Sequence, residues 1–88
     1  MIVRIMGEGR YEVPDADMPA VEQADSALVE ALDRGDEAAF AGALADLISV
    51  VRHTGKLIPA DDLRPSAQAV PHEGSTLAEV KALLADEA

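Results

Sequence analysis

The chain has 88 residues, a size that forms one domain with a marginal core. It carries 17 acidic and 7 basic residues, and the resulting net charge of −10 repels nucleic acids and anionic lipid headgroups. The absence of cysteine from the sequence excludes disulfides and thiolate metal ligands. We therefore expect a single domain over residues 1–88 that binds no nucleic acid and does not insert into a membrane by itself.

The hydrophobic segments are all short. The first apolar run, from Met1 to Met6, is too short for the core of a signal peptide and contains Arg4. No stretch approaches the roughly 18 apolar residues that a membrane-spanning helix needs. We expect a cytoplasmic protein.

Residues 1–14 predict a β-hairpin that turns on the three-residue loop Gly7-Glu8-Gly9. Apolar and polar side chains alternate on both sides of this loop, so that each face of the hairpin has one character. Glycines at both ends of the loop supply the positive φ that the chain reversal needs. The register set by this loop pairs Val3 with Val13, Ile5 with Tyr11 and Arg4 with Glu12.

The next segment, residues 17–34, has the period of an amphipathic helix. Asp15 or Asp17 is suited to cap its start, and Pro19 is tolerated in the first turn, where backbone N–H groups lack helical partners. Gly35 ends the helix. The predicted buried stripe consists of Val21, Ala24, Leu28, Ala31 and Leu32.

A second helix is predicted over residues 37–54, with Asp36 as its N-cap and Gly55 at its end. Most of its circumference is apolar, which is typical of a helix that packs against several neighbours. We expect it at the centre of the fold. Its bulky stripe is Phe40, Leu44, Leu47 and Val51, its smaller face Ala41, Ala45 and Ile48, and its narrow polar strip Gly42, Asp46, Ser49 and His53.

Three prolines indicate a non-helical connection over residues 56–74, within which residues 67–70 are suited to pair with the hairpin as a third strand. A last helix begins at Thr76, where Glu79 completes a capping box. Its apolar side consists of Leu77, Val80, Leu83 and Leu84. The expected fold class is α+β, an N-terminal β-hairpin with a short third strand packed on three α-helices.

Residues suited to chemistry are few, and each has a structural explanation. His53 lies with Arg52 and Lys56 at a helix C-terminus, where cations interact favourably with the helix dipole. His72 lies in the proline-rich connection, where a histidine is usually solvated. Two distant histidines with scattered carboxylates are weak indications of a metal site. We expect no enzyme, no cofactor and no catalytic or metal-binding residues.

Several motifs together resemble the PspA-associated family, PspAA, along nearly the whole chain. They are the opening I-V-R-I-M-G-E-G-R-Y-E-V-P, R-G-D-E-A-A-F at 34–40, L-I-P-A-D-D-L at 57–63, P-S at 65–66 and S-T-L-A-E-V-K-A-L-L at 75–84. The resemblance implies an accessory or regulatory role in envelope stress, beside PspA-type proteins, which are long helical hairpins that assemble on stressed membranes. It also implies recruitment to the inner face of the membrane through that partner. It supplies no binding residues.

Two surfaces are suited to a coiled-coil partner. The outer face of the hairpin carries Arg4, Met6 and Arg10, which combine an adaptable apolar side chain with arginines. Met6 would equally rest under the third strand without binding anything. The second surface is the border of helix 17–34 formed by Asp25 and Val29.

Two alternatives to an accessory binding module stay open. One is a self-associating structural domain that forms a homodimer through the hairpin edge or helix 17–34, because an uncovered strand edge invites pairing with another chain. The other is a small metal-dependent hydrolase that uses His53 or His72 with nearby acids. The many carboxylates are explained by solvated helix faces, and they also suit a basic partner.

Overall fold

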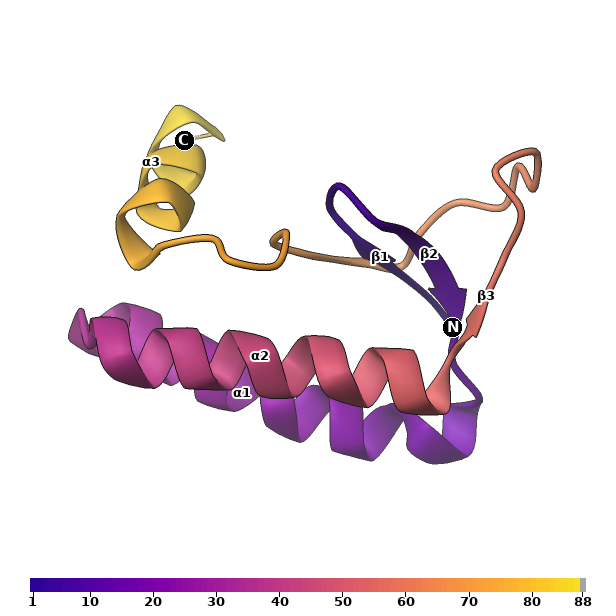
Figure 1. The fold of residues 1–88 in the computed structure, drawn as a ribbon, viewed down its shortest axis with the longest axis horizontal. Coiled ribbons are helices and arrows are strands. Elements are labelled where there is room, and N and C mark those ends of the chain that lie inside the picture. Colours follow the sequence, from indigo (N-terminus) through magenta and orange to yellow (C-terminus); the bar gives the residue numbers. More distant parts are fainter. Residues whose placement is uncertain (88) are drawn as a thin grey trace.

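The computed structural model describes the backbone of residues 1–87 and the side chains of residues 1–82. The fold is α+β, with a pair of antiparallel helices under one face of a small sheet and a third helix at the far end of that pair (Figure 1). The elements are β1 Ile2–Ile5, β2 Gly9–Glu12, the 3₁₀ turn η1 Asp15–Asp17, α1 Met18–Arg34, α2 Glu37–Thr54, β3 Lys56–Leu57, β4 Gln68–Val70 and α3 Leu77–Glu87. Within the described part of the chain, the helices are too short or too polar to cross a bilayer.

The helix pair forms where the sequence predicts it. The glycine junction is confirmed, because Gly35 adopts the left-handed conformation and the Asp36 carboxylate accepts a hydrogen bond from the Ala39 N–H at 3.0 Å. The predicted cap of α1 is wrong, since Asp17 makes no side-chain cap among the described residues. Asp17 already has near-helical φ and ψ of −96° and −7°, whereas a capping residue is normally extended. The Asp15 carboxylate lies instead 3.6 Å from the amino group of Met1.

The hairpin forms, but its predicted register is wrong by two residues. Val3 lies opposite Tyr11 and Arg4 opposite Arg10, so that the connection is Met6-Gly7-Glu8. The overturned pairs are Arg4 with Glu12, Ile5 with Tyr11 and Val3 with Val13. Because side chains alternate with a period of two, this shift leaves every residue on its predicted face.

Tertiary contacts explain why the observed register tolerates two arginines opposite each other. The Arg10 guanidinium is drawn away to the backbone carbonyls of Asp62 and Arg64. The released Glu12 carboxylate accepts instead from Arg64, at 2.7 Å. These partners lie more than 50 residues along the chain, so pairing rules applied to the hairpin alone do not include them.

The sheet has four strands in the order β3-β2-β1-β4. The predicted third strand is confirmed as β4, which runs parallel to β1. The sequence did not predict β3, whose two residues pair with β2 directly after α2. A strand of two residues is too short to show an alternating pattern in the sequence. It forms because the chain leaves α2 at Gly55 and continues beside β2. Both edges of the hairpin are therefore paired.

The core lies between the sheet and the helix pair, with α2 at its centre as predicted. The bulky stripe of α2 is fully buried, and its polar strip is exposed. Ala41 and Ala45 are exposed, so the small-residue face is covered less than the rest. Leu77 and Val80 of α3 join the core, while the side chains of Leu83 and Leu84 lie outside the described residues. The core comprises Val3, Ile5, Val13, Met18, Val21, Leu28, Ala31, Phe40, Leu44, Leu47, Ile48, Val51, Val70, Leu77 and Val80.

Candidate partner-binding surfaces

The outer face of the sheet points away from the helix pair and carries the exposed Arg4 side chain. Met6 lies in the hairpin turn with 41% of its surface exposed, and its N–H donates to the Val70 carbonyl at 2.9 Å. A hollow of about 620 Å³ opens on this face. Its lining residues are Arg4, Glu8, Gly9, Arg10, Leu57, Ile58, Pro59, Ala60 and Ser66.

Arg10 differs from Arg4 because its guanidinium is engaged within the protein. It is half-buried and donates to the backbone carbonyls of Asp62 and Arg64. Arg64 in turn pairs with the Asp62 carboxylate at 2.8 Å and with the Glu12 carboxylate at 2.7 Å. The hydrogen bonds from Arg64 lower the pKa of Asp62 to about 2. These contacts attach the loop of residues 58–66 to the hairpin.

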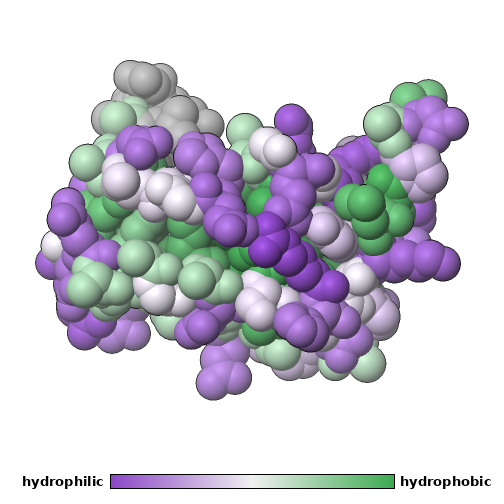
Figure 2. All heavy atoms as spheres, in the orientation of Figure 1, coloured by the Kyte–Doolittle hydropathy of each residue, from purple (hydrophilic) through white to green (hydrophobic). Residues whose placement is uncertain are grey.

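This loop projects beyond the sheet at the upper right of Figure 1, and the same projection carries hydrophobic and hydrophilic residues side by side in Figure 2. Leu63 is 93% exposed, the most exposed large apolar side chain in the described part of the chain. A turn closes just before this residue, where the Asp62 N–H donates to the Pro59 carbonyl at 3.1 Å. The sequence shows a single leucine between charged residues and prolines, which is a pattern suited to a surface loop. Only the fold determines how far the side chain is exposed.

A second ionic cluster fastens the hairpin turn to α2. The Glu8 carboxylate accepts from the Tyr11 hydroxyl at 2.7 Å and from Arg52 Nε at 3.0 Å, while Arg52 also bonds Glu73 at 2.5 Å. The hydrogen bonds from Arg52 and then Tyr11 lower the pKa of Glu8 to about 2. The bond to Glu8 raises the pKa of Tyr11. The sequence analysis assigned Arg52 only a favourable interaction with the helix dipole and did not predict this cluster. Because the cluster joins three segments of the fold, its structural role is sufficient to explain the pKa shifts of Glu8 and Tyr11.

The predicted surface on α1 lies on another element. Asp25 is half-buried, and Val29, one helical turn later, is 46% exposed. The structure therefore places the two predicted sets of binding residues on separate elements. Arg4 and Met6 belong to the hairpin, whereas Asp25 and Val29 belong to the helix pair.

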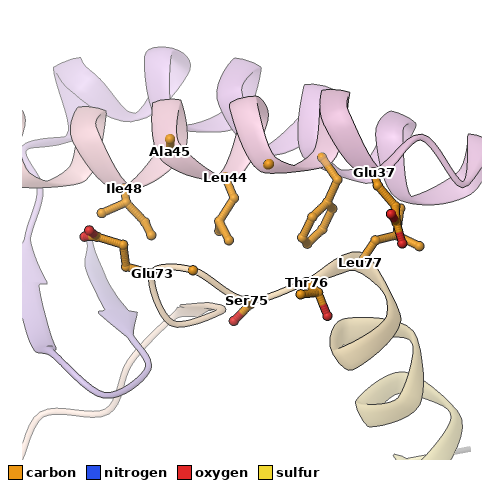
Figure 3. A pocket seen from close by; sticks show the side chains of 11 residues that line it. Glu37, Leu44, Ala45, Ile48, Glu73, Ser75, Thr76 and Leu77 are labelled. Atoms are coloured by element: carbon orange, nitrogen blue, oxygen red, sulfur yellow. The ribbon is translucent and has the colours of Figure 1, made fainter.

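An apolar groove of about 380 Å³ runs between α2 and the segment that precedes α3 (Figure 3). In this view, Leu44 points from α2 toward Ser75 on the opposite side, and Ile48 points toward Glu73. The hydroxyls of that side are already used. Ser75 donates to the His72 carbonyl at 2.7 Å, and Thr76 accepts from the Glu79 N–H at 3.1 Å in the predicted capping box. The groove thus offers mainly apolar contact.

The two histidines lie in unrelated surroundings. His53 Nδ1 is 2.8 Å from the Ser49 carbonyl one helical turn earlier, and His72 Nε2 is 3.7 Å from a Glu79 carboxylate oxygen. Within the described residues, the fold brings together no group of three histidine, aspartate or glutamate side chains suited to a metal ion. The hydrolase alternative therefore gains no support from the geometry.

Comparison with known proteins identifies one family. The family model described as PspA-Associated protein, PspAA, matches residues 1–88. Searches of curated proteins and of solved structures found no significant match.

Proposed function

Because the chain belongs to the PspA-associated protein family, PspAA, we propose that it binds a PspA-type protein as an accessory or regulatory partner. The family match along the whole chain carries this proposal. The proposed role is protein binding without catalysis, within the envelope-stress response. It places the protein in the cytoplasm, with recruitment to the inner face of the membrane through the partner.

The outer face of the sheet is the surface we propose for this contact. Arg4 is exposed there and has no ion pair among the described side chains, although the chain as a whole is strongly acidic. Met6 adds an exposed, adaptable apolar side chain in the hairpin turn that follows β1. A cation beside apolar surface suits a coiled coil that presents carboxylates along an apolar stripe.

The competing surface is α1, where Asp25 and Val29 would contact a helix laid alongside. Self-association is the competing function. The pairing of both hairpin edges by β3 and β4 weakens its edge-to-edge form, which leaves the helix face as the route to a homodimer.

Calorimetric titration with a purified PspA-type protein tests the proposal. Arg4→Glu should weaken binding, whereas Arg34→Glu, which changes the charge equally at the exposed end of α1, should not. Affinity should fall as salt rises if Arg4 meets carboxylates on the partner. No heat and no co-migration at tens of micromolar, about the range of a transient contact, would reject a direct partnership.

A further inference from the structure

We propose that the loop of residues 58–66 presents Leu63 as a preformed apolar anchor for the partner, and that Arg10 is the residue that positions this loop. The inference rests on the proposed function and deepens it, because it names the contact that supplies most of the affinity. It extends the binding surface from the outer face of the sheet onto the adjoining loop.

The exposure of Leu63 is the first observation. At 93%, it far exceeds the exposure of the other large apolar side chains in the described residues, the next being Leu57 at 59%. Leu57 belongs to β3 and lines the hollow on the outer face of the sheet, to which residues 58–60 of the same loop contribute a wall. Apolar residues thus run from β3 into the loop as far as Ala60, and Asp61 and Asp62 separate them from Leu63. Exposed apolar side chains that lie near one another mark interaction sites more often than scattered ones do.

The second observation is that the loop is tied down, although it lies at the surface. The Arg10 guanidinium donates to the carbonyls on both sides of Leu63, those of Asp62 and Arg64. The Asp62 carboxylate accepts from the Arg64 N–H at 3.0 Å and also pairs with the Arg64 side chain. Prolines at 59 and 65 restrict the backbone before and after the tip.

A tethered loop of this kind reduces the entropic cost of binding. An apolar side chain on a mobile loop loses backbone and rotamer freedom when it docks, whereas a preorganised one has lost much of it already. Single large side chains that fill a pocket commonly supply most of an interface's affinity. Arg10 satisfies two loop carbonyls at once, which the planar fork of a guanidinium can do and a lysine ammonium cannot do in the same geometry.

Charge indicates the partner's chemistry. Asp61 is exposed beside the anchor and has no ion pair among the described side chains. A helical partner with a leucine-sized apolar pocket bordered by lysine or arginine would complement both features. A second copy of this chain fits poorly, because its apolar groove along α2 is bordered by Glu37 and Glu73 and each copy carries a net charge of −10.

The first test measures the affinity of variants for the purified PspA-type protein. Leu63→Ala should weaken binding about ten-fold or more, with an unchanged thermal midpoint because the side chain makes little contact within the protein. Val29→Ala removes an exposed apolar side chain from α1 and should bind like the wild type. The reverse pattern would overturn the proposal and favour α1.

The second test concerns charge. Asp61→Asn should weaken binding several-fold, and the difference from the wild type should shrink at high salt. Asp33→Asn makes the same change at an exposed position of α1 and serves as the matched control. Equal effects of the two substitutions would show that only net charge matters, which would overturn the basic rim assigned to the partner.

The positioning role of Arg10 is tested by a double-mutant cycle. Arg10→Lys should weaken binding several-fold in the wild type and have little further effect in the Leu63→Ala background, because both changes act through the same anchor. Hydrogen exchange should rise at the amides of the loop while β1 and β2 stay protected. Additive effects on affinity would show that Arg10 touches the partner directly.

The outcomes separate this inference from the proposed function. If the wild type does not bind a PspA-type protein, the proposed function fails. If the wild type binds and Leu63→Ala binds equally well, the function stands and the anchor is rejected. Light scattering of the free protein tests whether a second copy of the chain occupies this site instead. A dimer that dissociates when Leu63 is replaced (Leu63→Ala) would assign the anchor to that second copy.

Discussion

Arginine side chains connect segments of this protein that lie far apart in sequence. Arg52 joins the hairpin turn to α2 and to the segment before α3, and Arg10 and Arg64 hold the projecting loop. The guanidinium group suits this task because it donates several hydrogen bonds in fixed directions. Since these pairs lie at the surface, each contributes little to global stability and more to the placement of loops.

Glu8 should make the stability of the protein depend on pH in the acid range. Its pKa is lowered from 4.5 to about 2 in the folded state, so the unfolded chain binds a proton more readily. The stability that Glu8 contributes is therefore present above about pH 4.5 and is lost as the pH falls toward about 2. The difference in thermal midpoint between the wild type and Glu8→Gln should shrink across that range. Glu22→Gln, at an exposed position of α1, should show no such convergence.

Gly9 is a position of the hairpin at which a side chain should be poorly tolerated. Its φ is +149°, and a Cβ there would lie 3.2 Å from Leu57 Cδ1 on the neighbouring strand. Gly9→Val should lower the free energy of unfolding by about 1 kcal/mol or more, because a branched side chain is strained at this φ. Denaturant titration measures this loss, and an unchanged midpoint would contradict the strain.

At the scale of elements, α2 organises the fold because its buried side chains form the middle of the core, whereas its outward side is exposed. It packs along α1, beneath the sheet and against the start of α3. Leu47 is fully buried and Phe40 nearly so, while Ser49 on the polar strip is exposed. Truncating a buried side chain of α2 therefore leaves a cavity that is lined by several elements.

Truncations along α2 should therefore differ sharply by face. Phe40→Ala and Leu47→Ala should each lower the free energy of unfolding by about 2–5 kcal/mol. Ser49→Ala should be nearly neutral, as expected for an exposed residue. Urea denaturation of the three variants measures the contrast, and similar losses at Leu47 and Ser49 would mean that the helix faces another way.

The two glycines of the α2 region should respond to alanine in opposite directions. A Cβ at Gly55 would lie 2.7 Å from the Val51 carbonyl and 2.9 Å from Tyr11 Cβ, so Gly55→Ala should lower the thermal midpoint. Gly42 lies within the helix with open space around it, and Gly42→Ala should raise stability by about 0.5–1 kcal/mol. Loss of stability in both variants would contradict the close approach at Gly55.

On the scale of the whole molecule, charge and strand pairing both oppose association between copies. The net charge of −10 makes two copies repel each other, and β3 and β4 cover both edges of the hairpin. The outer edges that remain belong to strands of two and three residues, which are poor templates for pairing.

Light scattering at micromolar concentration and moderate salt should therefore give the mass of one chain. A dimer would contradict this prediction and would favour the exposed face of α1 as the homodimer contact. If that dimer dissociated when salt is lowered, repulsion between the acidic surfaces would be the reason. The measurement is independent of any partner protein.

Local patterns in the sequence were sufficient for the helices, their glycine and aspartate junction, the two faces of the hairpin and the third strand. Each depends on periodicity or on capping within a few residues, and the family motifs at 2–14, 34–40 and 75–84 lie in these same segments. The hairpin register, the β3 strand and the Leu63 loop depended on tertiary structure. In each case the deciding contact joins distant segments: Arg10 to the loop carbonyls, Arg64 to Glu12, and Leu57 of β3 to Tyr11 of β2. A pattern read along the chain contains no information on which arginine reaches which carbonyl, because that is decided by how the packed elements place them.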